Sequence, residues 1–223
     1  MIVNDFKNRV NKHVLKSAYL EKETDFAYHI LMKICMYQMS VSMDNQQNIA
    51  KLKNIPNCDI LVLCEMWNCP YHNDALKTAY LRHDGLEALK NVAKSNKIWI
   101  VAGSIADKYN RCYILNSAGN IVCSYDKTHL FEFHNHQDYC EKEVFIPGNH
   151  LQCFDTPWGK CGILLCYDIR FPEVSRILAQ NGAQILFCPA AFNEQATKKH
   201  WKLFTICHQD FIIIKPYKIK MIS

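Results

Sequence analysis

Residues 162–173 read Gly162-Ile163-Leu164-Leu165-Cys166-Tyr167-Asp168-Ile169-Arg170-Phe171-Pro172-Glu173. The apolar first half is typical of a buried strand, and a proline followed by a glutamate is typical of the first turn of a helix. The same alternation recurs along the chain. Strands are expected at 33–40, 60–64, 98–103, 160–166 and 184–188, and helices at 45–53, 85–94, 172–181 and 195–207. Alternating strands and helices predict an α/β layered domain.

The region between these elements contains a hairpin and a long irregular stretch. Residues 111–115 and 121–125 flank a five-residue loop with Gly119, a pattern typical of a hairpin. Residues 128–149 are expected to be irregular. A further strand at 151–154 precedes a turn at 157–159.

The two ends of the chain differ from this pattern. Val3, Phe6, Val10 and Val14 are spaced three or four apart, which predicts helix before residue 31. After about residue 205 the alternation degrades. We therefore expect a helical extension at 1–31, a domain at 32–205 and a divergent tail at 206–223.

Length and composition fit one globular domain with a sizeable core. The chain has 223 residues, of which 49% are hydrophobic, and a net charge of +5 from 26 basic and 21 acidic residues. No apolar run approaches the ~18 residues that a membrane-spanning helix needs, and the charged first thirty-one residues do not resemble a secretory signal. The lysines are scattered, which argues against nucleic acid as a partner. We expect a cytoplasmic protein without a membrane partner.

Twelve cysteines raise the alternatives of disulfides or a metal site. Several sit inside apolar runs, where a reduced cysteine behaves as a small hydrophobe. No Cys-x-x-Cys pair occurs, so we expect neither a structural metal nor a cofactor. A metal-binding protein that uses its Cys and His remains a competing hypothesis, and it predicts stoichiometric metal in the purified protein.

Two candidate chemical groups follow apolar strands. Cys166 is expected at a strand-to-helix turn, where a thiol is exposed and its thiolate is stabilised by helical amides. Glu65 directly follows the run 60–64, at the strand end where sites of α/β sheets gather. Lys127 and Glu141 are also candidates. Taken singly, Cys166, Lys127 and Glu141 are better explained by an ordinary core or surface role, and for Glu65 the two interpretations are balanced.

Three motifs change this interpretation when they are read together. They are Leu63-Cys64-Glu65-Met66-Trp67-Asn68-Cys69-Pro70-Tyr71, Tyr125-Asp126-Lys127-Thr128-His129-Leu130-Phe131 and the segment 162–173. The order and residue types of these motifs resemble the carbon–nitrogen hydrolase, or nitrilase, superfamily over about residues 32–205. Within that superfamily they most resemble the amidases that act on small amides, including the ω-amidase-like group. Cys188-Pro189-Ala190-Ala191-Phe192-Asn193 and His200-Trp201 resemble the usual sequel.

The resemblance implies an α-β-β-α sandwich and a defined mechanism. Cys166 would attack the amide carbonyl, Glu65 would accept and return the thiol proton, and Lys127 would stabilise the oxyanion. Glu141 would position Lys127 or Glu65. The product is a thioester that water hydrolyses.

The same resemblance suggests residues that contact the small-molecule amide. Tyr71, Tyr167 and Phe192 are candidates to line a pocket, although aromatic residues at strand ends are often core. Arg170 could hold a substrate carboxylate, or it could pair with a neighbouring acid in its own segment.

The sequence departs from the family after about Thr205, where the strands that complete the second sheet are expected to be missing. Residues 1–31 do not resemble the family start either. The competing hypothesis is therefore a truncated and inactive remnant of such an amidase. The family often forms dimers near the nucleophile's helix, so a homodimer is also a possible state.

Overall fold

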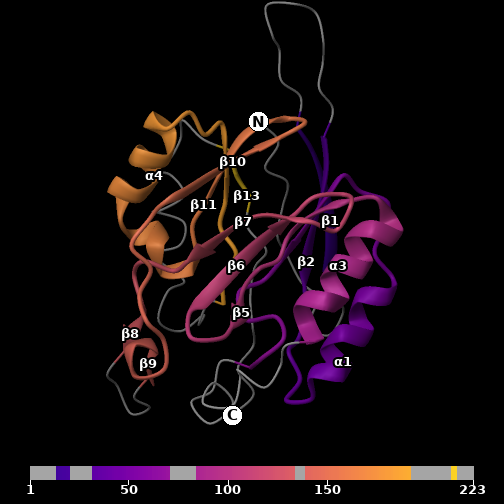
Figure 1. Ribbon diagram of the computed structural model, residues 1–223, viewed down its shortest axis with the longest axis horizontal. Helices are drawn as coiled ribbons and strands as arrows, with labels where there is room; N and C mark the ends of the chain where they lie inside the picture. The colour runs from indigo at the N-terminus through magenta and orange to yellow at the C-terminus, as the bar shows by residue number, and fades with distance from the viewer. Residues whose placement is uncertain (1–13, 21–31, 71–83, 134–138, 192–211, 215–223) are drawn as a thin grey trace, which may run out of the picture.

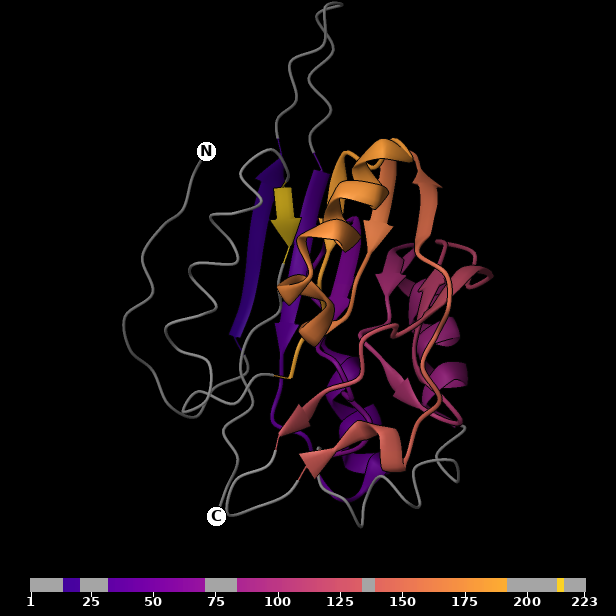
Figure 2. The same cartoon turned by 90° about the vertical axis from the view of Figure 1, so that its left-hand side faces the viewer.

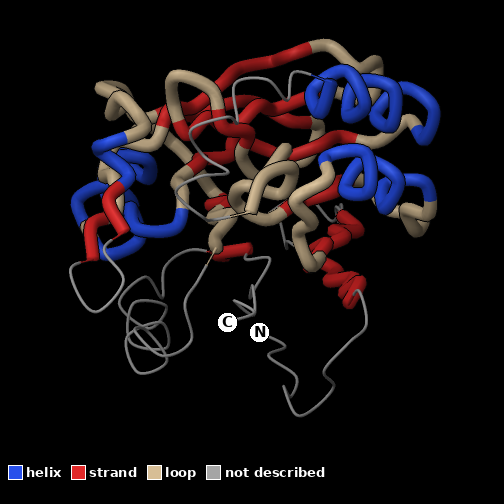
Figure 3. Tube along the Cα trace, turned by 90° about the horizontal axis from the view of Figure 1, so that it is seen from below, coloured by secondary structure: helices blue, strands red, loops and turns tan. Residues whose placement is uncertain are grey.

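In the computed structural model, two β-sheets pack face to face and helices cover their outer faces (Figure 1). The structure describes residues 14–20, 32–70, 84–133, 139–191 and 212–214. Seen from below, helices lie on the two outer sides and strands lie between them (Figure 3). The expected α-β-β-α arrangement is confirmed.

The first sheet has seven strands, in the order β1-β2-β3-β4-β6-β5, with β7 paired to β6. Their bounds are β1 (Val14–Leu20), β2 (Met32–Gln38), β3 (Ile60–Leu63), β4 (Trp99–Val101), β5 (Ile105–Ala106), β6 (Asn110–Leu115) and β7 (Ile121–Asp126). Strands β2, β3 and β4 run parallel, and β1, β6 and β7 are antiparallel to their neighbours.

The second sheet has four strands, in the order β10-β11-β12-β13. Their bounds are β10 (Gln152–Thr156), β11 (Gly159–Ile163), β12 (Ile185–Phe187) and β13 (Ile212–Ile214). A separate antiparallel pair consists of β8 (Glu132–Phe133) and β9 (Tyr139–Cys140).

The helices lie outside the sheets (Figure 1). On the first sheet they are α1 (Asn45–Ala50), η1 (Lys51–Lys53) and α3 (Asp84–Asn96). On the second sheet they are η4 (Cys166–Arg170) and α4 (Pro172–Gln180), and the short η3 (Glu141–Glu143) follows β9. Pro172 is the first residue of α4, as its fixed φ favours.

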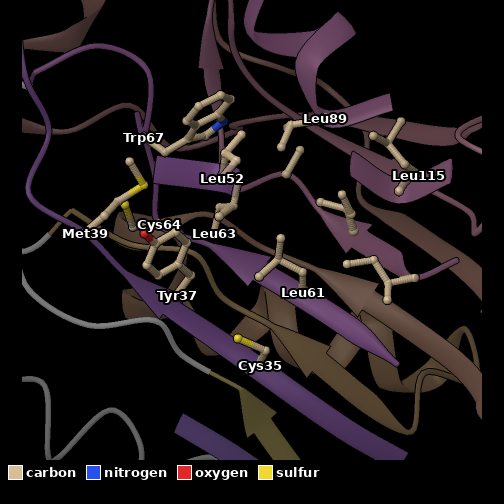
Figure 4. Close-up of a cluster of buried hydrophobic side chains, with 14 of the residues drawn as sticks. Cys35, Tyr37, Met39, Leu52, Leu61, Leu63, Cys64, Trp67, Leu89 and Leu115 are labelled. Carbon is tan, nitrogen blue, oxygen red and sulfur yellow. The ribbon is translucent and has the colours of Figure 1, made fainter. Parts of the chain in front are cut away.

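The central strands are buried on both faces because each face meets a different layer. On β3, Ile60 and Val62 face the second sheet, whereas Leu61 and Leu63 face the helices. Figure 4 shows the helix-side cluster, with Leu61 and Leu63 near Trp67 and Leu89. A strand enclosed in this way reads as a continuous apolar run, which explains why the sequence marked it clearly.

Several predicted elements differ from the structure. Residues 14–20 form a strand paired with β2, not a helix, because they fit the free edge of that strand. Strand β11 ends at Ile163, three residues before Cys166. The stretch 128–149 is not wholly irregular, since it holds β8, β9 and η3. The helix expected at 195–207 lies outside the described residues.

The tail supplies a strand that we did not expect. Ile212–Ile214 pairs in parallel with β12 (Figure 2). This strand extends the second sheet, whose closing strands we expected to be missing. The division of the chain at residues 31 and 205 stays a prediction. Among the described segments, no helix has the length and apolar character needed to cross a bilayer.

Helix α4 offers a direct test of this packing. Leu178 is fully buried against the second sheet, whereas its neighbour Ile177 is 44% exposed. We expect Leu178→Ala to lower the free energy of unfolding by about 2–5 kcal/mol, because it leaves a cavity. Ile177→Ala is the control and should cost much less. Urea unfolding of both variants measures the difference, and equal losses would contradict this placement of α4.

Candidate active site

Four of the predicted residues follow the ends of strands and meet in the interior. Glu65 lies two residues after β3, Lys127 directly follows β7, Glu141 begins η3, and Cys166 begins η4. The side chains of Glu65, Lys127 and Glu141 are fully buried. Groups that are 62 and 14 positions apart in the chain are thereby brought into contact.

Lys127 lies between the two carboxylates. Its Nζ is 2.8 Å from Glu65 Oε1, 3.1 Å from Glu141 Oε1 and 2.9 Å from Glu141 Oε2. A buried ammonium is costly unless it is paired and hydrogen-bonded, and here two anions surround it. This cluster of charges is the electrostatic centre of the site.

Asn110, which the sequence analysis did not identify, contacts both carboxylates of this cluster. Its Nδ2 donates to Glu65 Oε1 at 2.9 Å and to Glu141 Oε1 at 3.0 Å. Asn110 is the first residue of β6 and is 1% exposed. A single asparagine at a strand start carries no motif, so only the three-dimensional contacts identify it.

The other oxygen of Glu65 is held by the main chain. Ala191 N donates to Glu65 Oε2 at 2.9 Å. Burial raises the pKa of Glu65 above its usual 4.5, and the negative charge of Glu141 raises it further, while Lys127 opposes both. A carboxyl with a raised pKa is suited to exchange protons near neutral pH.

Lys127 stays charged in spite of its burial. Burial alone would lower its pKa, but the carboxylates of Glu141 and Glu65 outweigh this and raise the pKa well above 10.5. The site therefore holds a permanent positive charge beside Cys166.

The backbone of Cys166 is strained and its thiol is largely covered. Its φ is +40°, which is rare for a residue other than glycine. The residue is only 8% exposed, and Sγ lies 3.7 Å from the carbonyl oxygen of Ala191. The prediction of an exposed thiol was wrong, because the segment after β12 covers it.

This covering changes the resting state of the sulfur. Burial raises the pKa of the Cys166 thiol well above 9.0, and the negative charge of Glu65 adds to the effect, whereas Lys127 lowers it. Ala191 contacts both the thiol and Glu65, since its carbonyl oxygen accepts from the thiol and its N donates to Glu65 Oε2. Cys166 is therefore a neutral thiol that needs a base, and burial opposes the stabilisation of its thiolate that we expected from the strand-to-helix turn.

Asp168 joins the segment of Lys127 to the turn of Cys166. Its buried carboxylate accepts from Leu165 N at 2.9 Å, Tyr125 Oη at 2.8 Å, Thr128 Oγ1 at 3.1 Å and His129 N at 3.0 Å. His129 Nδ1 lies 2.9 Å from the same carboxylate. The sequence analysis placed Asp168 in a motif and among the acids that could pair with Arg170, but it did not predict this role.

Two glycines allow the strand ends to come together. A Cβ on Gly103 (φ +60°) would lie 1.9 Å from the carbonyl oxygen of Cys64, which precedes Glu65. A Cβ on Gly148 would lie 2.1 Å from the carbonyl oxygen of Asp126, which precedes Lys127. Both contacts are with main chain, which cannot rotate away. Each glycine thus fixes the segment that carries one charged group.

The predicted substrate contacts are only partly described. Tyr167 and Arg170 lie on η4 with Cys166, and the Arg170 guanidinium carbon is 5.1 Å from the centre of the Tyr167 ring. Phe131 and Phe171 also pack edge-on against that ring. Tyr71 and Phe192 lie outside the described residues. Within the described part of the chain, no group of three or more His, Cys, Asp or Glu residues could hold a metal ion.

Comparison with known proteins agrees with this geometry. Residues 33–206 match the family described as carbon-nitrogen hydrolase. The chain belongs to the carbon–nitrogen hydrolase family. The family resemblance read from the three motifs is confirmed.

The similar proteins include curated relatives and solved structures of this family. Nitrilase homolog 2 of Dictyostelium discoideum is 35% identical over 168 residues, which cover 70% of this chain and 49% of that protein. Omega-amidase NIT2 of Bos taurus is 30% identical over 186 residues, which cover 77% and 67%. Saccharomyces cerevisiae Nit3, of branch 10 of the nitrilase superfamily, has a TM-score of 0.73 at 27% identity and covers 86% and 78%. This carbon–nitrogen hydrolase chain spans about half to two thirds of the curated relatives' lengths.

The Asp168 contacts generate a prediction about stability. Asp168→Asn keeps the shape of the side chain but replaces one acceptor oxygen by a donor, which then faces other donors. We expect a loss of about 1–3 kcal/mol in the free energy of unfolding. Asp155→Asn, at an exposed position of β10, is the matched control and should have little effect. Thermal and urea unfolding measure both, and a neutral Asp168→Asn would contradict the anchoring role.

Proposed function

We propose that this chain hydrolyses the carbon–nitrogen bond of a small amide through a thioester on Cys166. The observation that carries the proposal is the contact network in which Lys127 donates to Glu65 Oε1, while Ala191 contacts both Glu65 Oε2 and the Cys166 thiol. A nucleophile, a base and a fixed positive charge are the three parts that acyl transfer requires.

The first step is proton transfer followed by attack. Glu65 accepts the thiol proton, and the sulfur forms a bond to the amide carbonyl carbon. The raised pKa of the thiol makes this base necessary, and the shared contact with Ala191 brings Glu65 and the thiol to the same place. The carbonyl π electrons move onto oxygen, which becomes an oxyanion.

Lys127 stabilises this oxyanion. An ammonium has three donors, and its two carboxylate partners leave one for the substrate oxygen. The backbone amide of Tyr167, the residue after Cys166, is the second donor in the proposal. Such donors are worth about 3 kcal/mol each in the barrier.

Collapse of the intermediate completes the cycle. The carbon–nitrogen bond breaks as Glu65 returns its proton to the nitrogen, and ammonia or an amine leaves. Glu65 then takes a proton from water, the resulting hydroxide attacks the thioester, and the proton returns to sulfur as the carboxylic acid leaves. Glu141 is unchanged and keeps Lys127 in place.

The substrate class is also a proposal. The name omega-amidase of several relatives supports an amide substrate, and Arg170, on the same short helix as Cys166, is the residue that we propose to bind a substrate carboxylate. Tyr167 would border the acyl group, together with Tyr71 and Phe192. The competing proposal of an inactive remnant predicts no turnover and a melting curve with weak or absent cooperativity.

The variant series tests the three roles. Ammonia release from small aliphatic amides should be abolished in Cys166→Ala. It should fall about 10²–10⁴-fold in Glu65→Gln, which removes the base, and about 10²–10³-fold in Lys127→Met. Cys161→Ala, a buried cysteine on β11, is the control and should keep its activity. Equal ammonia release by wild type and Cys166→Ala would reject the proposal.

The pH dependence follows from the state of Glu65. The base must be ionised, and its pKa is raised above 4.5, so kcat/KM should fall as the pH drops through that raised value. The apparent pKa of this acidic limb of the pH profile describes the coupled cluster rather than Glu65 alone. A profile of kcat/KM at constant ionic strength measures it, and a rate that stays constant down to pH 4.5 would contradict the assignment of Glu65 as base.

A further inference from the structure

Asn110 has a position in the site that the proposed mechanism does not use. Its one Nδ2 atom contacts both carboxylates of the cluster, at 2.9 Å to Glu65 Oε1 and 3.0 Å to Glu141 Oε1. These are the same two oxygens that Lys127 Nζ contacts, at 2.8 Å and 3.1 Å. Each of the two oxygens therefore accepts from one charged and one neutral donor.

Stability alone does not explain an asparagine here. Its Oδ1 is buried and has no hydrogen-bond partner among the described residues. A buried acceptor without a partner destabilises a fold, and leucine would fill a similar space without that cost. The residue type is explained by the two N–H donors, since both are used.

A neutral donor also suits the charge of the cluster. The groups that face Asn110 are Glu65 after β3, Lys127 after β7 and Glu141 of η3, and Cys166 of η4 lies beyond Glu65. A second cation in place of Asn110 would neutralise both carboxylates and weaken Glu65 as a base. An amide holds them without adding charge.

We propose that Asn110 is a positioning residue that holds Glu65 and Glu141 together around Lys127, so that the Oε2 side of Glu65 is directed toward Cys166. This inference rests on the proposed function of Glu65. With Oε1 held by Asn110 and Lys127, Oε2 is left on the side of Ala191, whose carbonyl contacts the Cys166 sulfur.

The main chain of Asn110 strengthens the same arrangement. Its carbonyl oxygen accepts from Lys127 N at 3.0 Å, so one residue fixes both the backbone of Lys127 and its carboxylate partners. The next residue, Arg111, instead pairs with Asp126 at 2.6 Å and is partly exposed. Of these two neighbours on β6, Asn110 therefore contacts the site, whereas Arg111 forms an ion pair outside it.

The test compares Asn110→Leu, which removes both donors at similar volume, with Asn110→Ser, which keeps one. Misplacement of the base should reduce kcat/KM for amides up to about a hundredfold in Asn110→Leu, with a smaller loss in Asn110→Ser. N–H donation favours the ionised carboxylate, so its loss should also move the acidic limb of the profile to higher pH. Arg111→Gln is the control: it should lower the melting temperature without moving that limb.

A second readout keeps this inference separate from the proposed function. The rate at which iodoacetamide alkylates Cys166, followed on the Cys166 peptide by mass spectrometry, depends on proton transfer to Glu65 and needs no amide turnover. We expect the pH dependence of that rate to shift in Asn110→Leu and not in Arg111→Gln. If wild type hydrolyses no amide but this shift occurs, the proposed function fails and the positioning role stands. If Asn110→Leu folds, as its melting curve would show, and both profiles match wild type, the positioning role is overturned.

Discussion

The arrangement depends on burying one ammonium group between two carboxylates. Lys127 has no exposed surface, and neither have Glu65 and Glu141. Such a cluster is tolerated only when every charge has close partners, because water cannot solvate it. The ends of β3 and β7 and the start of η3 must therefore converge on one point. Removing Lys127 would leave two buried carboxylates without a cation, so the structure that holds the cluster and the chemistry it supports depend on the same contacts.

The sulfur is held in a different way. Cys166 occupies a left-handed backbone conformation, which costs free energy unless the surroundings impose it. Asp168 imposes it from one side by accepting from Leu165 N and from the segment that follows Lys127. The residues after β12 cover the other side. The positive charge and the nucleophile are thus linked by a network of neutral and charged hydrogen bonds that does not pass through the reacting atoms.

Much of this could be predicted from the sequence, and the failures have physical causes. Buried strands such as 60–63 appear as apolar runs, and motifs around Glu65, Lys127 and Cys166 marked the strand ends. Asn110 could not be found, because its partners lie 45 and 31 positions away and no pattern links them. The helix expected before residue 31 was wrong at 14–20, where pairing with the edge of β2 outweighs helical spacing. The burial of Cys166 depends on Ala190 and Ala191, which local sequence around the thiol does not report.

Gly103 and Gly148 have a consequence for engineering the protein. Each places a bare α-carbon against a carbonyl oxygen of a neighbouring segment, at distances no side chain could occupy. Loop exchange between homologues, or insertion of new sequence to alter substrate choice, would have to preserve hydrogen as the only substituent at both points. Redesign is therefore restricted at these two points, because the segments that precede Glu65 and Lys127 tolerate no side chain against their main chain.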